Sequence, residues 1–300
     1  MRHSTTPTIL AALLTLALAA PLGAAPPVVD GTLDAVYGAA QEVQTIQTQF
    51  GNATDGNPGY CNGSELDAFY AIGEGGWLYV FIAGNLESNY NKLEVFVDSK
   101  PGGQNVLRND NPNVDFNGLN RMAGLTFDAG MEPDFWLGVT GGDAGGTYKI
   151  FCNTAELLAD GGGEGNYAGE GGARTDGTLS GGTNPSGLRV TIDNSNTAGV
   201  DGGCAAAAGG ASVTTGLEIA VPLDALEYAG GPIKVTVFVN GGGHDYVSNQ
   251  VLGGLPDGTC NLGEPANVNF AALSGDQFVE LQQQTPARHR SWGQVKIRYR

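Results

Sequence analysis

Lys92-Leu93-Glu94-Val95-Phe96-Val97-Asp98 is the stretch that decides the fold of this chain. Its aliphatic residues fall on one face, and Lys92, Glu94 and Asp98 fall on the other. A period of two is typical of a half-buried strand in an antiparallel sheet. The same alternation returns in 216–223 and 235–239. The chain is therefore expected to build antiparallel sheet with one face toward a core.

Short segments of this kind recur along the chain, separated by Gly, Asn, Asp or Pro. We expect strands at Val43–Phe50, Glu65–Ile72, Trp77–Ala83, Lys92–Asp98, Met122–Phe127, Phe135–Val139, Tyr148–Phe151, Leu188–Ile192, Val213–Val221, Ile233–Val239, Asp245–Asn249 and Gln277–Leu281. Helical pattern is confined to Thr154–Leu158 and Leu223–Tyr228. The predicted fold is all-β, an antiparallel β-sandwich of the immunoglobulin-like or jelly-roll type with long Gly-rich loops.

The two ends of the chain differ from its body. Arg2 and His3 precede an apolar run at Ile9–Ala20, which is too short to span a bilayer and predicts a secretory signal peptide at 1–25. At the other end, five of the 14 Lys and Arg residues lie within 288–300. The segment 286–300 is interpreted as a basic tail, either a last strand or a sorting signal.

The segment between these ends, 26–285, is expected to form a single β-sandwich domain. Within it, 141–211 holds 20 of the chain's 49 glycines and is interpreted as long loops between short strands. The signal peptide predicts that the protein is secreted and is extracellular or at the cell surface. No transmembrane segment is expected in the mature protein.

The chain has a formal net charge of −17, which argues against nucleic acid or an anionic membrane as partner and suits divalent cations. Its four cysteines lack C-x-x-C spacing, so a zinc site is not expected. Export favours two disulfides, with the pairing left open among three possibilities. The candidates are Cys61, Cys152, Cys204 and Cys260.

Four stretches, in this order, resemble family 9 carbohydrate-binding modules and the wider DOMON-like β-sandwich group. They are Asp30–Asp34, Trp77–Ile82, Lys92–Asp98 and Gly216–Leu223. The resemblance implies a β-sandwich that binds glycans without catalysis. A longer set of stretches resembles uncharacterised secreted bacterial proteins, and this match brings no activity. The set includes Gln44–Gly51, Ser64–Asp67, Leu125–Gly130 and Asp193–Val200.

Sugar-binding modules present exposed aromatic rings, which stack on the apolar faces of pyranoses. The aromatic residues that we consider for this role are Trp77, Trp136, Tyr148 and Tyr246. For Trp77 and Trp136, which flank apolar strands, packing in the core is the competing interpretation.

Two loops rich in Asp and Asn could supply oxygen ligands to Ca²⁺. The first is Asn109–Gly118, with Asp110, Asn113 and Asp115 as the candidate ligands. The second is Asp193–Asn196 together with Asp201. Asp and Asn also favour ordinary turns, which is the competing interpretation of both loops.

No catalytic constellation stands out, so the sequence predicts a non-catalytic binding protein that recognises a glycan or a cell-surface polymer. A structural envelope or matrix protein without a small ligand is the alternative. A glycoside hydrolase is less favoured, because Glu94 and Asp98 would lie about 13 Å apart on one strand face, too far for either hydrolytic geometry.

Overall fold

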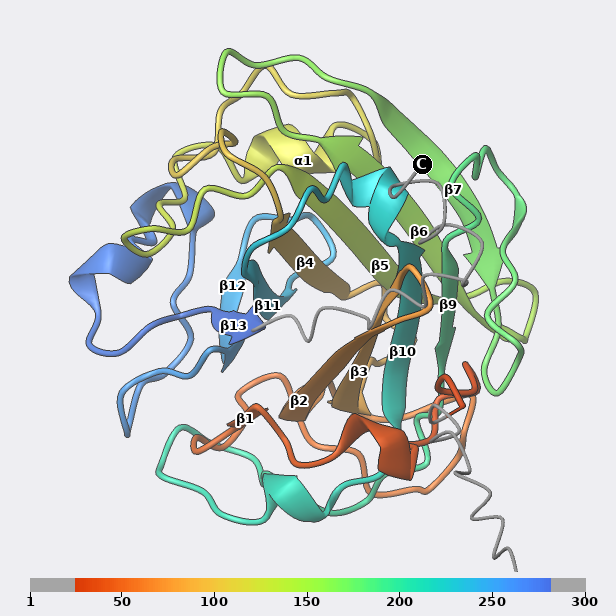
Figure 1. The fold of residues 1–300 in the computed structure, drawn as a ribbon. Helices are drawn as coiled ribbons and strands as arrows, with labels where there is room; N and C mark the ends of the chain where they lie inside the picture. Colours follow the sequence, from red (N-terminus) through yellow and green to blue (C-terminus); the bar gives the residue numbers. More distant parts are fainter. Residues whose placement is uncertain (1–24, 282–300) are drawn as a thin grey trace, which may run out of the picture.

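Two antiparallel β-sheets packed face to face make up the protein (Figure 1). The computed structural model describes residues 25–281. The smaller sheet has the order β1-β2-β3-β10-β9 and consists of β1 (Glu42–Val43), β2 (Glu65–Glu74), β3 (Trp77–Asn85), β10 (Gly216–Pro222) and β9 (Arg189–Ile192). The predicted antiparallel β-sandwich is confirmed.

The larger sheet has eight strands, with β4 between β11 and β5. Its order is β12 (Val247–Leu252), β11 (Ile233–Asn240), β4 (Lys92–Asp98), β5 (Phe135–Asp143), β6 (Tyr148–Glu156), β7 (Gly165–Gly171) and β8 (Ser180–Gly181), and β13 (Val279–Leu281) pairs with β11. Helices are short: α1 (Gly118–Arg121), η1 (Ala35–Tyr37), η2 (Gly210–Ser212), η3 (Leu223–Leu226), η4 (Pro265–Asn267) and η5 (Phe270–Ala272). None of the helices in 25–281 is long and apolar enough to cross a membrane.

The core between the sheets is made by the alternating aliphatic residues of the strands. Leu93, Val95 and Val97 of β4 belong to one apolar cluster with Val80 of β3 and Ile219 of β10. Because the side-chain period of a strand is two, the same residues that marked the strands in the sequence turn together toward the opposite sheet.

The outer face of the larger sheet is also buried, contrary to the half-buried strand predicted from the alternation. Lys92 and Glu94 are 5% and 0% exposed. The segments 100–133 and 253–278 lie over this face and add a second apolar cluster around Phe96. Both segments are loop-rich, so their covering role has no periodic signature in the sequence.

The outer face of the smaller sheet is covered by the N-terminal segment. The backbone N–H groups of Asp30 and Gly31 donate to Glu218 Oε2, and the Tyr37 hydroxyl donates to Glu218 Oε1 at 2.8 Å. Burial raises the pKa of Glu218 to about 7, although these three donors act in the opposite direction. The first and last of the four sequence stretches are thus joined at one buried carboxyl group.

Several local predictions were wrong. Residues 122–127, expected as a strand, follow α1 as a turn with a single residue, Thr126, in β-bridges. Of the helix expected at 154–158, residues 154–156 are the end of β6 instead and 157–158 have no regular structure. Apart from Ala25, the predicted signal peptide lies outside the described residues, as does the basic tail.

The Gly-rich segment contains more sheet than expected, because β7 pairs with β6 although three of its seven residues are glycine. Glycine is a poor strand former, so its pairing depends on the neighbouring strand and leaves little trace in the sequence.

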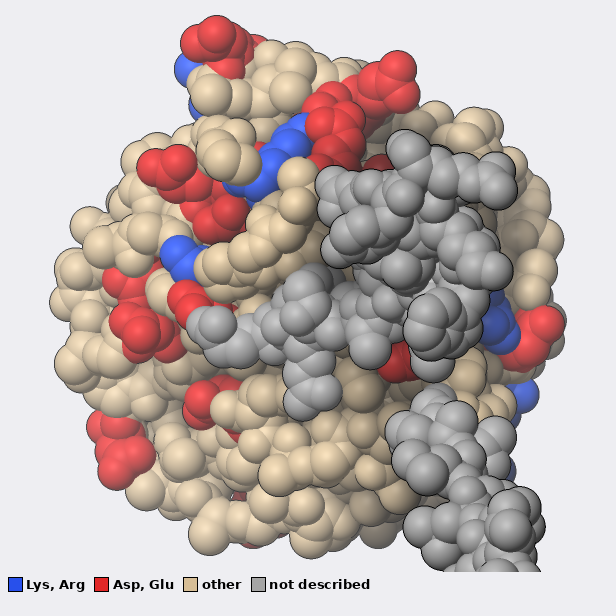
Figure 2. Space-filling view, viewed as in Figure 1, with Lys and Arg blue, Asp and Glu red and all other residues tan. Residues whose placement is uncertain are grey.

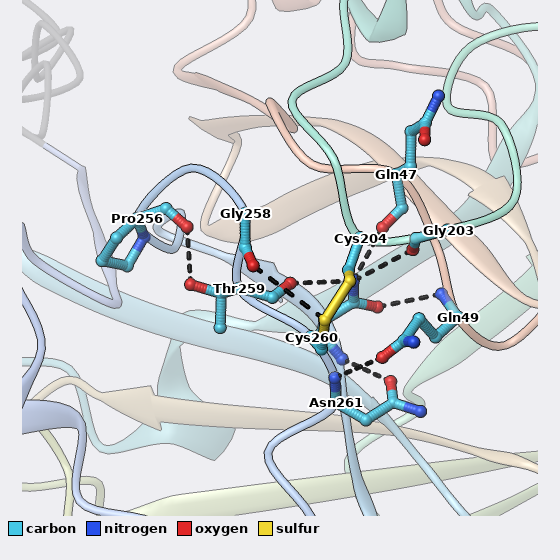
Figure 3. Close-up of a disulfide and its surroundings, with 10 residues drawn as sticks. Gln47, Gln49, Gly203, Cys204, Pro256, Gly258, Thr259, Cys260 and Asn261 are labelled. Carbon is cyan, nitrogen blue, oxygen red and sulfur yellow. Dashed lines mark hydrogen bonds between the residues drawn. A yellow bond between two sulfur atoms is a disulfide. The ribbon is translucent and has the colours of Figure 1, made fainter.

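One disulfide joins Cys204 to Cys260, 56 residues apart, and ties the loop before η2 to the loop after β12 (Figure 3). The prediction of two disulfides is therefore wrong, because the four cysteines form only one. Cys61 and Cys152 are free thiols, 3% and 0% exposed, and burial raises the pKa of both. A buried, protonated thiol reacts slowly, since the thiolate is the nucleophile.

We predict that a thiol reagent finds no reactive thiol in the native protein at neutral pH and two per chain after unfolding without reductant. Titration with a chromogenic disulfide reagent, with and without denaturant, measures this. Four thiols after unfolding, or none, would contradict the cysteine pairing.

Candidate functional site

A pocket of about 470 Å³ opens on the outer face of the larger sheet, beyond the edge of the loops that cover this face. Strands β4, β5, β6 and β7 supply its floor and one wall, and the segments before β4 and before α1 supply the rest. It is lined by Tyr90, Lys92, Asp115, Phe116, Thr140, Phe151, Asn153 and Tyr167. Half of these residues are aromatic and the others carry polar groups.

The aromatic residues form the rim and the polar residues form the floor. Phe116 is 93% exposed, Tyr90 50% and Tyr167 39%, whereas Thr140 and Asn153 are 3% and 4% exposed. Large apolar side chains are seldom left this exposed without a partner, and three of them around one hollow indicate a binding surface.

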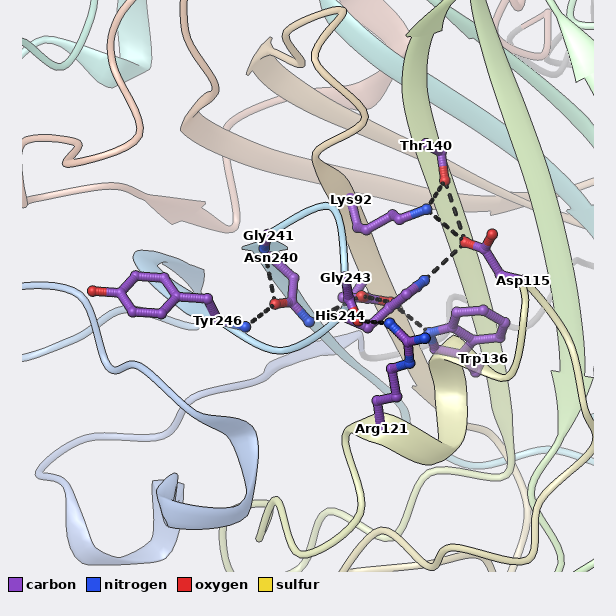
Figure 4. A network of polar contacts seen from close by, with 11 residues as sticks. Lys92, Asp115, Arg121, Trp136, Thr140, Asn240, Gly241, Gly243, His244 and Tyr246 are labelled. Carbon is purple, nitrogen blue, oxygen red and sulfur yellow. Dashed lines mark hydrogen bonds and ion pairs between the residues drawn. The ribbon is translucent and has the colours of Figure 1, made fainter.

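The floor is held by a network of charged side chains beneath it (Figure 4). Lys92 Nζ contacts Asp115 Oδ2 at 2.9 Å and Thr140 Oγ1 at 2.8 Å. His244 Nε2 contacts the same Asp115 oxygen at 2.8 Å, and His244 Nδ1 contacts Glu94 Oε1 at 2.7 Å. The chain of contacts therefore runs from Lys92 through Asp115 and His244 to Glu94, across residues from three distant segments.

Glu94 lies deepest in this network and receives two further hydrogen bonds. Trp136 Nε1 donates to Glu94 Oε2 at 2.8 Å, and Asn240 Nδ2 donates to Glu94 Oε1 at 3.1 Å. A buried carboxylate is tolerated when it is paired and its lone pairs are satisfied, which these donors achieve.

Two pKa shifts follow from this pairing. Burial alone would lower the pKa of His244, but Glu94 and then Asp115 raise it to about 9. Burial would raise the pKa of Asp115, yet the hydrogen bonds from His244 and Lys92 bring it down to about 2. At neutral pH the His244 ring is therefore positively charged and Asp115 is ionised.

This arrangement stabilises the fold around the pocket and does not suit acid–base catalysis. Both ring nitrogens of His244 are engaged and the side chain is 2% exposed. A general base must reach a proton on the substrate, and His244 has no free nitrogen to do so.

The loop that carries Asp115 and Phe116 is strained. Asp115, Phe116 and Asn117 have φ of 45°, 54° and 66°, three consecutive non-glycine residues in the left-handed region. Each costs of the order of 1 kcal/mol and persists only when its surroundings impose it. The ion pairs at Asp115 supply that constraint and leave Phe116 at the exposed tip.

Gly118 is needed where this loop enters α1. A Cβ atom built on Gly118 would lie 2.2 Å from Cδ2 of His244. The imidazole ring occupies the space of the missing side chain, so any larger residue would push His244 out of line with its carboxylates.

The four aromatic residues predicted as ligand contacts lie elsewhere. Trp136 and Tyr148 are 1% and 3% exposed and offer no ring face to solvent. Trp77 is partly buried against the outer face of the smaller sheet. Tyr246 is exposed and stacks on Phe50 with ring centroids 6.2 Å apart, and it is not among the residues that line the pocket.

Two exposed aromatic residues of the pocket have a signal in the sequence that could have identified them. Tyr90 stands between Asn89 and Asn91, and Phe116 stands between Asp115 and Asn117. An aromatic residue inside a run of turn-forming polar residues has no strand partner to bury it, which favours exposure.

The Asn109–Gly118 loop does not present its acids to a cation. Asp110 is exposed and accepts from Arg108 through both oxygens, at 2.8 and 2.7 Å. Asp115 is neutralised by Lys92 and His244, and Asn113 is exposed. Within residues 25–281 no three His, Cys, Asp or Glu side chains gather as a metal-binding group.

A second hollow of about 240 Å³ lies at one end of the core between the sheets. Its walls are core aliphatic residues such as Val95 and Ile219, and its mouth is bordered by 183–186 and Glu227. Polar side chains such as Glu156, Glu164 and Asn166 also line it, but none of its lining residues is an exposed aromatic, so the pocket rimmed by Phe116 is the stronger candidate.

Comparison with models of protein families, with curated proteins and with solved structures finds no match for this chain.

We predict that His244→Asn lowers the free energy of unfolding by about 3–5 kcal/mol at pH 6.5, because it leaves Glu94 and Asp115 buried without their shared cation. Urea unfolding followed by circular dichroism measures the change. Asp110→Asn, at an exposed ion pair, is the matched control and should unfold as the wild type does.

The same network predicts a pH dependence. The folded pKa of His244, about 9, lies above its ordinary value of 6.5. Its stabilisation is therefore complete below pH 6.5 and disappears as the pH rises through 9. The difference in unfolding free energy between wild type and His244→Asn should shrink from pH 6.5 to 10, and a constant difference would contradict the charged imidazole.

Proposed function

We propose that this protein is a secreted, non-catalytic binding protein that recognises a glycan or a cell-surface polymer in the pocket rimmed by Tyr90, Phe116 and Tyr167. The observation that carries the proposal is the pairing of exposed rings with a fixed polar floor. Sugars present both kinds of surface, since C–H groups cover the faces of a pyranose and hydroxyl groups its edges.

The pocket has the right size and donors for a short saccharide. Its volume of about 470 Å³ falls within the range of small-molecule sites, roughly 300–1,000 Å³. Two of the three hydrogens on Lys92 Nζ are directed to Asp115 and Thr140, which leaves one donor for a ligand hydroxyl. Asn153 adds an amide on the same floor.

The charge of the protein favours a neutral ligand. Acidic side chains are spread over the face seen in Figure 2, and the few Lys and Arg side chains there lie next to them. The lysine in the pocket is itself neutralised by Asp115. A polyanionic polymer would meet repulsion from most of this surface.

Secretion and the family resemblance support the same proposal. The apolar run at Ile9–Ala20 has the length and flanking residues of a signal peptide, and the Cys204–Cys260 disulfide suits an oxidising compartment. The order of the four stretches that resemble family 9 carbohydrate-binding modules adds to this, since those modules are β-sandwiches that bind sugars.

The competing classes fit the pocket less well. A structural envelope or matrix protein has no use for three exposed rings around one hollow. A glycoside hydrolase needs two carboxyl groups beside the bond that it cleaves, and Asp115 is the one carboxylate among the residues lining the pocket. Its pairing with Lys92 and His244 keeps it ionised, which does not suit a general acid.

We predict that the mature protein binds a neutral glycan on a polysaccharide and oligosaccharide array, and that Phe116→Ala and Tyr167→Ala each weaken binding about tenfold or more. Tyr246→Ala, which removes an exposed ring outside the pocket, is the matched control and should bind normally. Calorimetry with the glycan found on the array measures the affinities.

Equal losses of glycan affinity in Tyr246→Ala and Phe116→Ala would mean that the glycan binds elsewhere on the surface. An array without any bound glycan, on folded protein, would favour the structural alternative.

A further inference from the structure

Two carboxyl groups are buried at the start of β2, in the smaller sheet, whereas the pocket lies on the larger one. Glu65 and Asp67 are 1% and 0% exposed. Neither forms an ion pair with a Lys, Arg or His side chain within residues 25–281. Acidic side chains are rarely buried so fully unless a positive charge accompanies them. The described residues supply none here.

The polar groups around the two acids supply too few hydrogens. The Asn196 amide nitrogen lies within hydrogen-bond distance of three acceptors, Glu65 Oε1 at 2.8 Å, Asp67 Oδ2 at 3.1 Å and the Ala198 carbonyl oxygen at 2.5 Å. An amide nitrogen has only two hydrogens. The cluster is therefore rich in oxygen and poor in donors.

Two oxygen atoms in this region have no partner. Glu65 Oε2 and Asn85 Oδ1 are buried and accept no hydrogen bond. The two residues face each other across the β2–β3 ladder, so their side chains lie on the same face of the smaller sheet. A water molecule could donate to both oxygens but would bring no positive charge to the two acids.

We propose that Glu65, Asp67 and Asn85 bind one Ca²⁺ ion, with the main-chain carbonyl of Ala198 as a further ligand. Carboxylate, amide and carbonyl oxygens are the ligands that this hard cation takes, and it accepts irregular geometries. Two carboxylates balance its charge, so a third acid is not required. The site differs from the Asn109–Gly118 loop, whose acids have basic partners.

The ion would fasten the 193–200 loop to the smaller sheet. Asn196 and the Val200 N–H already contact Asp67, and the Asn194 side chain exchanges hydrogen bonds with the backbone of Leu86 at the end of β3. Calcium binding at Glu65 and Asp67 should therefore raise the stability of the folded chain by mass action.

The test is a calorimetric titration of Ca²⁺ into the full mature chain after treatment with a chelator, with the melting temperature recorded in parallel. We expect one ion per chain and a higher melting temperature. Glu65→Gln and Asp67→Asn, which keep the shape of each side chain, should each lose about tenfold or more in affinity. Asp110→Asn, in the other acidic loop, is the matched control and should bind as the wild type does.

Native mass spectrometry of the wild type provides a readout that depends on no variant. One Ca²⁺ retained per chain supports the site, and a chain without a bound ion in millimolar Ca²⁺ overturns it. Unchanged affinity in Glu65→Gln, or a loss confined to Asp110→Asn, would also overturn the assignment.

Discussion

The charged network of Glu94, His244, Asp115 and Lys92 is the constraint on which the pocket depends. It joins β4 to the turn after β11 and to the loop before α1, segments that are up to 150 residues apart in the chain. Its ion pairs at Asp115 offset part of the strain of three left-handed residues at 115–117 and help to hold Phe116 at the rim. The shape of the candidate pocket therefore depends on buried electrostatics, because the exposed loop alone does not determine its own shape.

The sandwich encloses the inner face and most of the outer face of each sheet, and this explains where its polar chemistry lies. The inner faces form one aliphatic core, while loops and the N-terminal segment cover much of the outer faces and add two smaller apolar clusters. Charged residues on the outer faces are thereby enclosed and must be paired, as Glu94 is by His244 and Glu218 by Tyr37. The covering loop reaches β7 at Gly165 but leaves the surface around Phe151, Asn153 and Tyr167 open, and this surface contributes to the pocket.

The sequence predicted the sheets well and the site poorly, for a physical reason. Strands such as β4 and β11 are specified locally by their alternation, which predicted the sandwich and most of its core. Loop coverage follows from contacts between distant segments, so Lys92 and Glu94 were expected on an open face. His244 follows three glycines in the sequence, and only the fold brings it between Glu94 and Asp115. The cysteine pairing could not be predicted either, because the sequence does not reveal which loops lie next to each other in the fold.

The central claim is that His244 carries a positive charge that holds the floor of the pocket in place. Nuclear magnetic resonance of protein labelled with ¹⁵N-histidine measures this directly, with His244→Asn used to assign the signal. The account predicts that both ring nitrogens stay protonated up to about pH 8 and titrate near pH 9. A ring that titrates near 6.5, the ordinary value for histidine, would contradict it.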